Sequence, residues 1–179
     1  MTWKFDPMHT SIEFSVRHMM VSRVKGRFGT ISGAIDLDES NLINSSLEVE
    51  VDTASVDTGL SPRDNDLRSP NFLYVEKYPR MTYKSRRIEP RKDGYQVIGD
   101  LTIRGVTREV VLDADFAGIV TDPYGNVRAG FSAETEIDRK DFGLEWNMAL
   151  EAGGVLVGDK VKISVEAEAV REGEKREAA

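Results

Sequence analysis

The sequence predicts an all-β domain of antiparallel strands, and three observations support this class. Apolar and polar residues alternate with a period of two in one segment after another, as in strands with one buried face. Turn-forming stretches such as "DESN", "RKDG" and "TDPYGN" separate these segments. The 179 residues, 40% of them hydrophobic, suit one domain with a sizeable core. About eight half-buried strands in series predict a sandwich or a closed up-and-down barrel.

The expected strands follow one another along the chain. In the first, "SIEFSVRH", Ile12, Phe14 and Val16 share one face, and Val161 and Ile163 do the same in the last. Alternation of this kind covers residues 11–18, 30–37, 46–51, 80–85, 94–103, 108–119, 127–137 and 159–169. We therefore expect a single domain over residues 1–170 and a flexible charged tail over residues 171–179.

The segment "SVDTGLSPRDNDLRSPNFLYVEKYP", residues 55–79, interrupts this alternation. Ser61 before Pro62 is a helix start signal, and Asp64 in the first turn faces the positive end of the helix dipole. Ser69 and Pro70 repeat the start signal a few residues later. A short helical segment is expected around residues 61–77.

Composition excludes several classes of function. The net charge of −7 disfavours binding to nucleic acid, because affinity for the phosphate backbone comes from clustered Lys and Arg. The chain has no cysteine and only His9 and His18, so we expect neither disulfides nor a metal site. No secretory signal pattern and no membrane-spanning segment are seen, which predicts a cytoplasmic protein. An exposed edge or apolar patch would allow a homodimer.

The apolar face leaves open whether the interior is filled or hollow. A barrel of about eight strands has an interior that side chains can fill, or that holds one small ligand. Bulky residues alternate here with Gly33, Gly99, Ala114 and Ala167, so both alternatives fit. A hollow interior would have aliphatic and aromatic walls. Such walls favour a long apolar ligand, since burying the unpaired polar groups of a sugar or nucleotide costs several kcal/mol.

Six motifs occur in the same order as in YceI-like proteins: "DPMHTSIEFSVRHMMVSRVKGRFG", "SVDTGLSPRDNDLRSPNFL", "KYPRMTYKS", "GDLTIRGVTREVVL", "IDRKDFGL" and "VGDKVKISVEAEA". The chain resembles this polyisoprenoid-binding, lipocalin-like family over about residues 3–170. The resemblance implies an antiparallel eight-stranded barrel whose tunnel holds a long-chain polyisoprenoid, either quinone-like or prenyl-phosphate-like. It implies no shared catalytic reaction and no catalytic cofactor.

Two positions depart from the family pattern. Asp66 stands where many relatives have His, and Thr10 stands where Ser is usual. Both departures concern the chemistry around a ligand head group rather than the fold. Many relatives also carry a signal peptide and are periplasmic.

The strand faces and the resemblance together assign the expected ligand contacts. The tunnel wall is expected to consist of Phe14, Val16, Ile35, Val49, Met81, Val97, Leu101, Leu112, Phe131 and Ile163. Residues 55–79 are expected to cover one mouth. There the ligand would meet His18, Arg63, Leu67 and Phe72, with Leu60 and Leu73 also turned inward and Asp64 and Arg68 at the rim.

Other interpretations compete with this one. His18 is either a hydrogen-bonded structural residue or a head-group contact. An enzyme acting on an apolar substrate would use His18 with a carboxylate, and a barrel with a filled core would act as a stress or interaction module. Asp138, Arg139 and Asp141 suggest acid–base chemistry, but a tight turn explains them better. We expect non-catalytic binding, sequestration or transport of the lipid.

Overall fold

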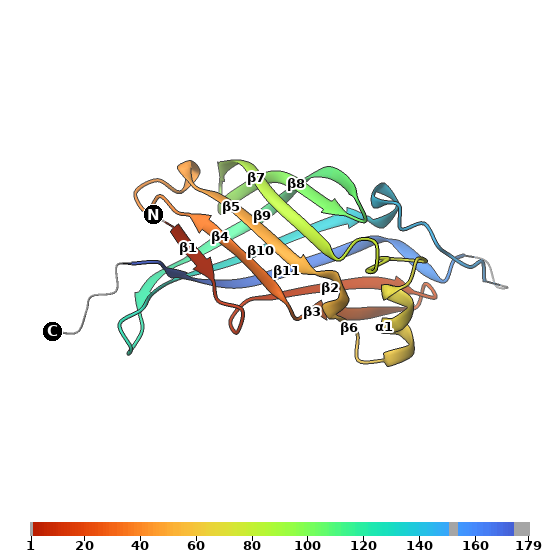
Figure 1. Cartoon of the computed structure of the whole chain (residues 1–179). Coiled ribbons are helices and arrows are strands. Elements are labelled where there is room, and N and C mark those ends of the chain that lie inside the picture. Colours follow the sequence, from red (N-terminus) through yellow and green to blue (C-terminus); the bar gives the residue numbers. More distant parts are fainter. Residues whose placement is uncertain (1, 151–153, 174–179) are drawn as a thin grey trace.

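The chain folds into a closed antiparallel β-barrel of eight strands with one α-helix, in a computed structural model that describes residues 2–150 and 154–173 (Figure 1). Within these residues eleven strand segments form one sheet: β1 (Thr2–Phe5), β2 (Ser11–His18), β3 (Ser22–Phe28), β4 (Ile31–Asp36), β5 (Ser46–Asp52), β6 (Val56–Asp57), β7 (Arg80–Arg91), β8 (Gly94–Ile103), β9 (Val106–Thr121), β10 (Val127–Asp138) and β11 (Val157–Arg171). The short helices are η1 (Leu42–Asn44), η2 (Thr53–Ser55), α1 (Ser61–Arg68) and η3 (Arg139–Phe142).

The eleven strand segments occupy eight positions in the barrel, because three of the barrel strands are interrupted. The interrupted strands consist of β1 with β2, β3 with β4, and β5 with β6. Segments β1 and β2 pair with the same edge of β11, in the registers Trp3 to Arg171 and Val16 to Val161. On their other side β1 pairs with β4 and β2 pairs with β3, and β4 and β3 pair in turn with β5 and β6. Pro7, Gly29 and η2 lie at the three interruptions. The β1–β11 and β2–β11 pairings close the barrel.

The predicted antiparallel barrel is confirmed, and the alternative of a sandwich is excluded. Each of the eight predicted segments overlaps one barrel strand, whereas β1, β3 and β6 were not predicted. Strand β11 continues to Arg171, one residue beyond the predicted domain boundary. Residues 174–179 of the predicted tail lie outside the described residues.

The helical segment is shorter than predicted. Helix α1 has Leu60 rather than Ser61 as its N-cap, and it ends at Arg68. The Asp64 carboxylate accepts a hydrogen bond from the Thr58 amide at 2.9 Å, so it fixes the preceding loop. Residues 70–77 form hydrogen-bonded turns instead of a second helix. Helix α1 lies at the opposite end of the barrel from β1 (Figure 1).

The barrel interior is packed locally where bulky and small residues face each other. A Cβ atom on Gly26 would lie 2.4 Å from the Phe14 ring, and one on Gly99 would lie 2.7 Å from the Tyr83 hydroxyl. Two apolar clusters result, one around Tyr83 and Phe28 and a smaller one around the fully buried Trp3. In the described part of the chain, no helix is long and apolar enough to cross a bilayer.

Candidate ligand cavity

The barrel interior is hollow along much of its length. It contains a cavity of about 440 Å³ whose lining comes from β2–β11, α1 and the loops beside them. The volume is within the range of small-molecule binding sites. On β11 the lining runs from Val157 to Ala167, ten residue steps. Ten steps span about 33 Å along a strand, or about 25 Å along the axis of a barrel with typical tilt. The space is therefore long and narrow.

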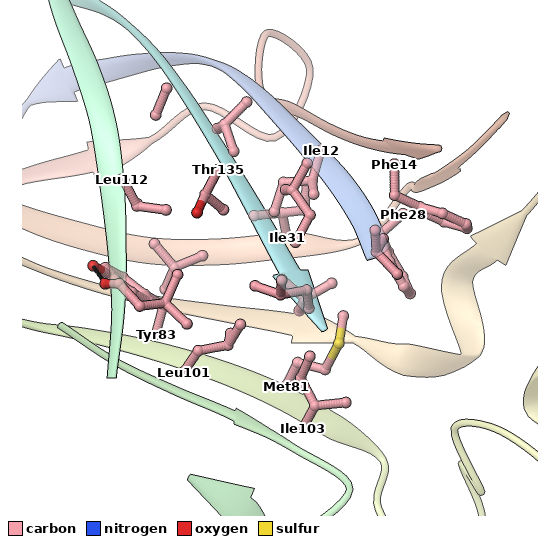
Figure 2. A pocket seen from close by; sticks show the side chains of 18 of the residues that line it. Ile12, Phe14, Phe28, Ile31, Met81, Tyr83, Leu101, Ile103, Leu112 and Thr135 are labelled. Atoms are coloured by element: carbon pink, nitrogen blue, oxygen red, sulfur yellow. Dashed lines mark hydrogen bonds between the residues drawn. The ribbon is translucent and has the colours of Figure 1, made fainter. Parts of the chain in front are cut away.

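The middle of the cavity is apolar, and two hydroxyls that face it, those of Tyr83 and Thr135, are already hydrogen-bonded. Figure 2 shows Ile12, Leu101 and Leu112 among the side chains around this space. The Tyr83 hydroxyl lies 3.0 Å from the Val110 carbonyl, to which it donates, and burial raises the pKa of Tyr83 above its ordinary value. Thr135 likewise donates to the Val111 carbonyl at 2.9 Å. Because these hydroxyls need no hydrogen-bond partner from a ligand, this wall suits a hydrocarbon chain.

All fourteen predicted contact residues line this one cavity. The ten wall residues come from β2, β4, β5 and β7–β11, and they are Phe14, Val16, Ile35, Val49, Met81, Val97, Leu101, Leu112, Phe131 and Ile163. His18, Arg63, Leu67 and Phe72 line its α1 end. Ligand contact by any of these residues stays a prediction. The alternative of a filled core does not agree with the cavity.

The charged lining residues are unevenly distributed between the ends. Arg17 and His18 lie at the end of β2, Arg63 and Asp66 lie on α1, and Arg139 begins η3, whereas Asp115 lines the cavity from β9. Four of the five side chains at the α1 end are basic or can become cationic. Two donors of Arg63 bind Thr58, to Oγ1 at 2.7 Å and to the carbonyl at 2.9 Å. This end combines donors with an apolar interior, which suits an amphiphile with a polar or anionic head.

His18 lines the cavity without a structural partner. Among the described residues, its ring makes no hydrogen bond or ion pair, and only its backbone carbonyl accepts one, from Ser22. Within the described residues, the alternative of a hydrogen-bonded structural histidine therefore has no support. Among the described residues, the ring also has no contact with a carboxylate of the kind that general acid–base catalysis would use.

Residues 69–78 are held over the α1 end of the cavity by several polar contacts. Arg104 donates to the carbonyls of Pro70 at 2.7 Å and Phe72 at 2.6 Å, and Thr53 donates to the Tyr78 carbonyl at 2.8 Å. Phe72 is buried and its ring lies 5.5 Å from that of Trp146. We call residues 58–79 the cover segment.

Three predicted positions in the cover segment are wrong. Leu60 is the N-cap residue of α1, is 50% exposed and does not line the cavity. Asp64 is buried and binds Thr58, so it is not a rim charge. Arg68 is used structurally, donating to the carbonyls of Ala54 at 2.9 Å and Val56 at 3.0 Å.

Arg139 organises the loops after β10. Its side chain is 4% exposed and donates to the carbonyls of Gly158 at 2.8 Å, Leu144 at 2.6 Å and Trp146 at 2.9 Å. Burial lowers the pKa of Arg139, and the nearby carboxylate of Asp159 opposes this effect. Sequence reasoning assigned "IDRKDFG" to a tight turn. The η3 turn agrees with that, whereas the sequence does not predict the burial of Arg139. Trp146 lines the cavity.

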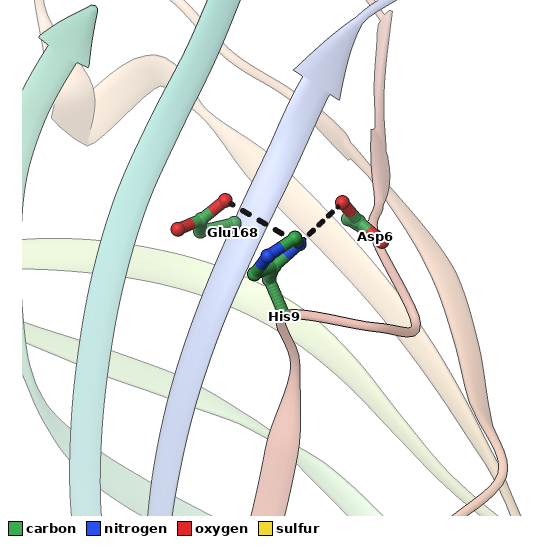
Figure 3. A group of neighbouring side chains, drawn as sticks. All are labelled: Asp6, His9 and Glu168. Atoms are coloured by element: carbon green, nitrogen blue, oxygen red, sulfur yellow. Dashed lines mark hydrogen bonds and ion pairs between the residues drawn. The ribbon is translucent and has the colours of Figure 1, made fainter. Parts of the chain in front are cut away.

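A second polar cluster lies outside the cavity, where β1 gives way to β2. Figure 3 shows His9 between Asp6 and Glu168, with Nδ1 2.8 Å from Asp6 Oδ2 and 3.9 Å from Glu168 Oε2. Three potential metal ligands thus lie within 4.8 Å of one another. However, Arg128 already binds Asp6 at 2.7 Å and Glu168 at 3.3 Å. Because this guanidinium supplies the positive charge, the cluster is best explained as a structural ion-pair network.

The Arg128 network holds two carboxylates in their ionised form. Hydrogen bonds from Arg128 and His9 lower the pKa of Asp6 to about 2. Arg128 also lies 2.8 Å from Asp122 and lowers the pKa of that carboxyl below its ordinary value. The network joins residues more than a hundred positions apart, so sequence spacing offered no signal for it.

The fold and the cavity agree with a comparison against known proteins. Residues 3–169 match the YceI-like domain, and the chain belongs to this family. It is 37% identical to a UPF0312 protein of Staphylococcus epidermidis over 167 residues, which covers 93% of this chain and 95% of the relative. A UPF0312 protein of Vibrio parahaemolyticus is 42% identical over 135 residues, covering 75% and 71% of the two chains. The resemblance expected from the six motifs is confirmed.

Solved structures share the architecture. The Campylobacter jejuni YceI protein superposes with a TM-score of 0.71 at 30% identity, covering 88% of this chain and 90% of that one. BcnA of Burkholderia cenocepacia reaches a TM-score of 0.80 at 21% identity, with 92% and 98% coverage. A polyisoprenoid-binding domain from Saccharophagus degradans has a TM-score of 0.68 at 14% identity, with 95% and 98% coverage. The last two similarities establish the shared fold only.

Proposed function

We propose that this protein binds a long-chain polyisoprenoid inside its barrel, without catalysis, and sequesters or transports it. The observation that carries the proposal is the long apolar cavity, in which the hydroxyls of Tyr83 and Thr135 already donate to backbone carbonyls. Burial of hydrocarbon there gains about 25 cal/mol per Å² removed from water. The polyisoprenoid-binding domain among the structural neighbours supports the choice of lipid class.

The head group is proposed to lie at the α1 end. His18 has no partner among the described residues, and Arg63 lies beside the same lining, so both offer donors to a quinone carbonyl or a phosphate. A phosphate would gain more from Arg63, since charge-assisted hydrogen bonds are roughly twice as strong as neutral ones. The tail would extend from there towards Phe131 and Ile35, near the other end of the cavity.

Organic extraction and mass spectrometry of the purified protein test the proposal. We expect close to one long-chain isoprenoid per protein, and its mass distinguishes a quinone from a prenyl phosphate. An extract without stoichiometric lipid, together with failure of the emptied protein to take up either class, would exclude the carrier function.

A paired substitution on β9 tests whether the lipid occupies the cavity. Ala114 lines the cavity, whereas Ala117 on the same strand is exposed on the outside. Ala114→Trp places a large ring in the tunnel, so lipid recovered on extraction should fall to a small fraction of the wild-type value. Ala117→Trp should retain wild-type lipid, and circular dichroism should report a folded barrel for both variants. Equal lipid content in the two would place the lipid elsewhere.

A further inference from the structure

The hairpin between β2 and β3 breaks three rules of stable hairpins at one place. Its loop residues Met19 and Met20 have φ angles of 52° and 63°, in the left-handed region where Asn and Gly are preferred. The loop is also exposed and apolar: Met19 is 46%, Met20 53% and Val21 85% exposed. Next to the loop, Arg17 lies directly opposite Arg23, a like-charge pair that opposes strand pairing.

Three cationic side chains on this hairpin have no ion-pair partner among the described residues. Arg23 and Lys25 point outward on β3, and with Arg17 they have no ion-pair partner in the described part of the chain. The neighbouring carboxylate of Asp57 is paired with Arg27, and that of Asp159 is shared between Arg139 and Lys140. A protein with a net charge of −7 therefore carries a local cationic surface around an apolar tip.

A second exposed apolar site adjoins the hairpin. The Met19 amide donates to the Leu156 carbonyl at 2.8 Å, and the Leu156 amide donates to the Met148 carbonyl at 2.9 Å. Met148 is 57% and Val155 38% exposed. We call Met19, Met20, Val21, Met148 and Val155 the apolar tip. Arg17 and Leu156 also line the cavity, so the apolar tip borders the cavity's α1 end.

We propose that the apolar tip and its cationic flank form a docking surface for an anionic lipid bilayer. Exposed Met and Val side chains would enter the interfacial region, and Arg17, Arg23 and Lys25 would contact anionic head groups. Such contacts also remove the repulsion between Arg17 and Arg23. An apolar chain could then pass between bilayer and cavity without crossing water. This transfer of an apolar chain rests on the proposed function, whereas docking to the bilayer does not.

Flotation with vesicles of phosphatidylcholine and phosphatidylglycerol tests the docking surface. The variant Met19→Asn with Met20→Gly removes two apolar side chains and relieves the left-handed strain, so it should be at least as thermostable as the wild type. Vesicle binding should nevertheless fall at least about tenfold. Replacing Arg23 and Lys25 by Gln should weaken binding about thirtyfold, and added salt should weaken the wild type. Vesicles of phosphatidylcholine alone should bind less protein.

Exposed apolar residues at the far end supply a matched control. Val120 and Tyr124 are 66% and 91% exposed in the β9–β10 hairpin, and Val120→Ser with Tyr124→Ser should leave vesicle binding unchanged. Equal binding by the wild type and the Met19/Met20 variant would overturn the proposal. A concentration-dependent dimer that this variant abolishes, without vesicle binding by the wild type, would also overturn it, because the surface would then join two copies.

Extraction of the same variant separates docking from cargo binding. Met19 and Met20 do not line the cavity, so the variant should carry as much isoprenoid as the wild type. Lost vesicle binding with retained lipid supports docking. Vesicle binding by a wild-type protein that never contains lipid would support docking while contradicting the proposed function.

Discussion

Arg139 is 4% exposed, and its donors meet backbone carbonyls on both sides of the loops after β10. Removing the guanidinium would leave the carbonyls of Gly158, Leu144 and Trp146 without this donor, and Asp159 would be paired with Lys140 alone among the described residues. We expect Arg139→Ala to lower the free energy of unfolding by about 3 to 5 kcal/mol, measured by urea denaturation. Arg139→Lys should recover little of this loss, since one ammonium cannot reach the dispersed carbonyls.

The matched control for Arg139 is an exposed arginine. Arg87 is 54% exposed and pairs with Glu89 on its own strand, so Arg87→Ala should change stability by less than about 0.5 kcal/mol. Full recovery of stability by Arg139→Lys would show that charge alone, rather than the hydrogen-bond geometry, is what the loops require.

At the residue scale, the sequence predicted apolar positions better than polar ones. Alternation assigned the wall residues to the inward face because a strand has a strict period of two. No such period exists in the cover segment, so Leu60 and Asp64 were misplaced. From the sequence alone, Arg104 is interpreted as a charge at a strand end, either on the surface or at the cavity rim. Its donation to the carbonyls of Pro70 and Phe72 depends on a contact across more than thirty residues.

One side chain from the β8–β9 turn, Arg104, makes several of the contacts that hold the cover segment. Besides its two hydrogen bonds, Arg104 lies 5.6 Å from the centre of the Tyr74 ring. Arg104→Ala should loosen residues 71–78 while leaving the barrel strands unchanged. Amide exchange at Leu73, Val75 and Tyr78 should accelerate about tenfold or more, because each charge-assisted hydrogen bond contributes roughly 1.5 to 3 kcal/mol.

Exchange measurements on a neighbouring variant control for this prediction. Arg108 is exposed and, in the part of the chain that the structure describes, donates only to the adjacent Thr107 carbonyl, so Arg108→Ala should leave exchange in residues 71–78 unchanged. If bound lipid lies beneath the cover segment, its removal should also accelerate exchange there. Protection that changes only elsewhere would contradict the role of this segment as a cover.

At the element scale, strands with clear alternation were found and irregular ones were missed. In β3 the inward positions are Val24, Gly26 and Phe28, and the glycine weakens the apolar signal. Segments β1 and β6 have four and two residues, too short for a period to be recognised. The Ser69–Pro70 start signal did not produce a helix, because tertiary contacts of Phe72 and Leu73 with the core favour turns.

For the whole molecule, the alternation pattern alone predicts neither that the sheet closes into a barrel nor that the barrel interior is hollow. A sandwich and a barrel share the same alternation, and closure depends on the pairing of β1 and β2 with β11, far apart in the chain. Whether bulky residues fill the interior depends on which small residue each one faces. The Phe14 ring packs against Gly26 and the Tyr83 ring packs against Gly99. Beside these packed pairs the barrel interior contains the cavity. The family resemblance decided between the alternatives.

Barrel closure is reinforced by the Arg128 network, and this makes stability depend on pH. Asp6 has a pKa of about 2 in the folded protein, below its ordinary value of 3.8, and the pKa of Asp122 is also lowered. A depressed carboxyl pKa stabilises the fold above the ordinary pKa, and this contribution is lost as pH falls through the folded value. Stability should therefore decline from about pH 4 towards pH 2.

Asp6→Asn removes one titrating group from this network while retaining the Oδ1 acceptor that binds the Met8 amide at 2.9 Å. The Asp6 side chain is 14% exposed, and solvent screening limits the expected loss at neutral pH to about 1 kcal/mol. Between pH 4 and 2 the variant should lose stability less steeply than the wild type, in urea denaturation at each pH. Asp93→Asn, at an exposed turn position without an ion pair among the described residues, should follow the wild-type curve. Parallel curves of unfolding free energy against pH for all three proteins would contradict this prediction. They would mean that the ion pair between Arg128 and Asp6 does not stabilise the contact of β1 and β2 with the β9–β10 hairpin.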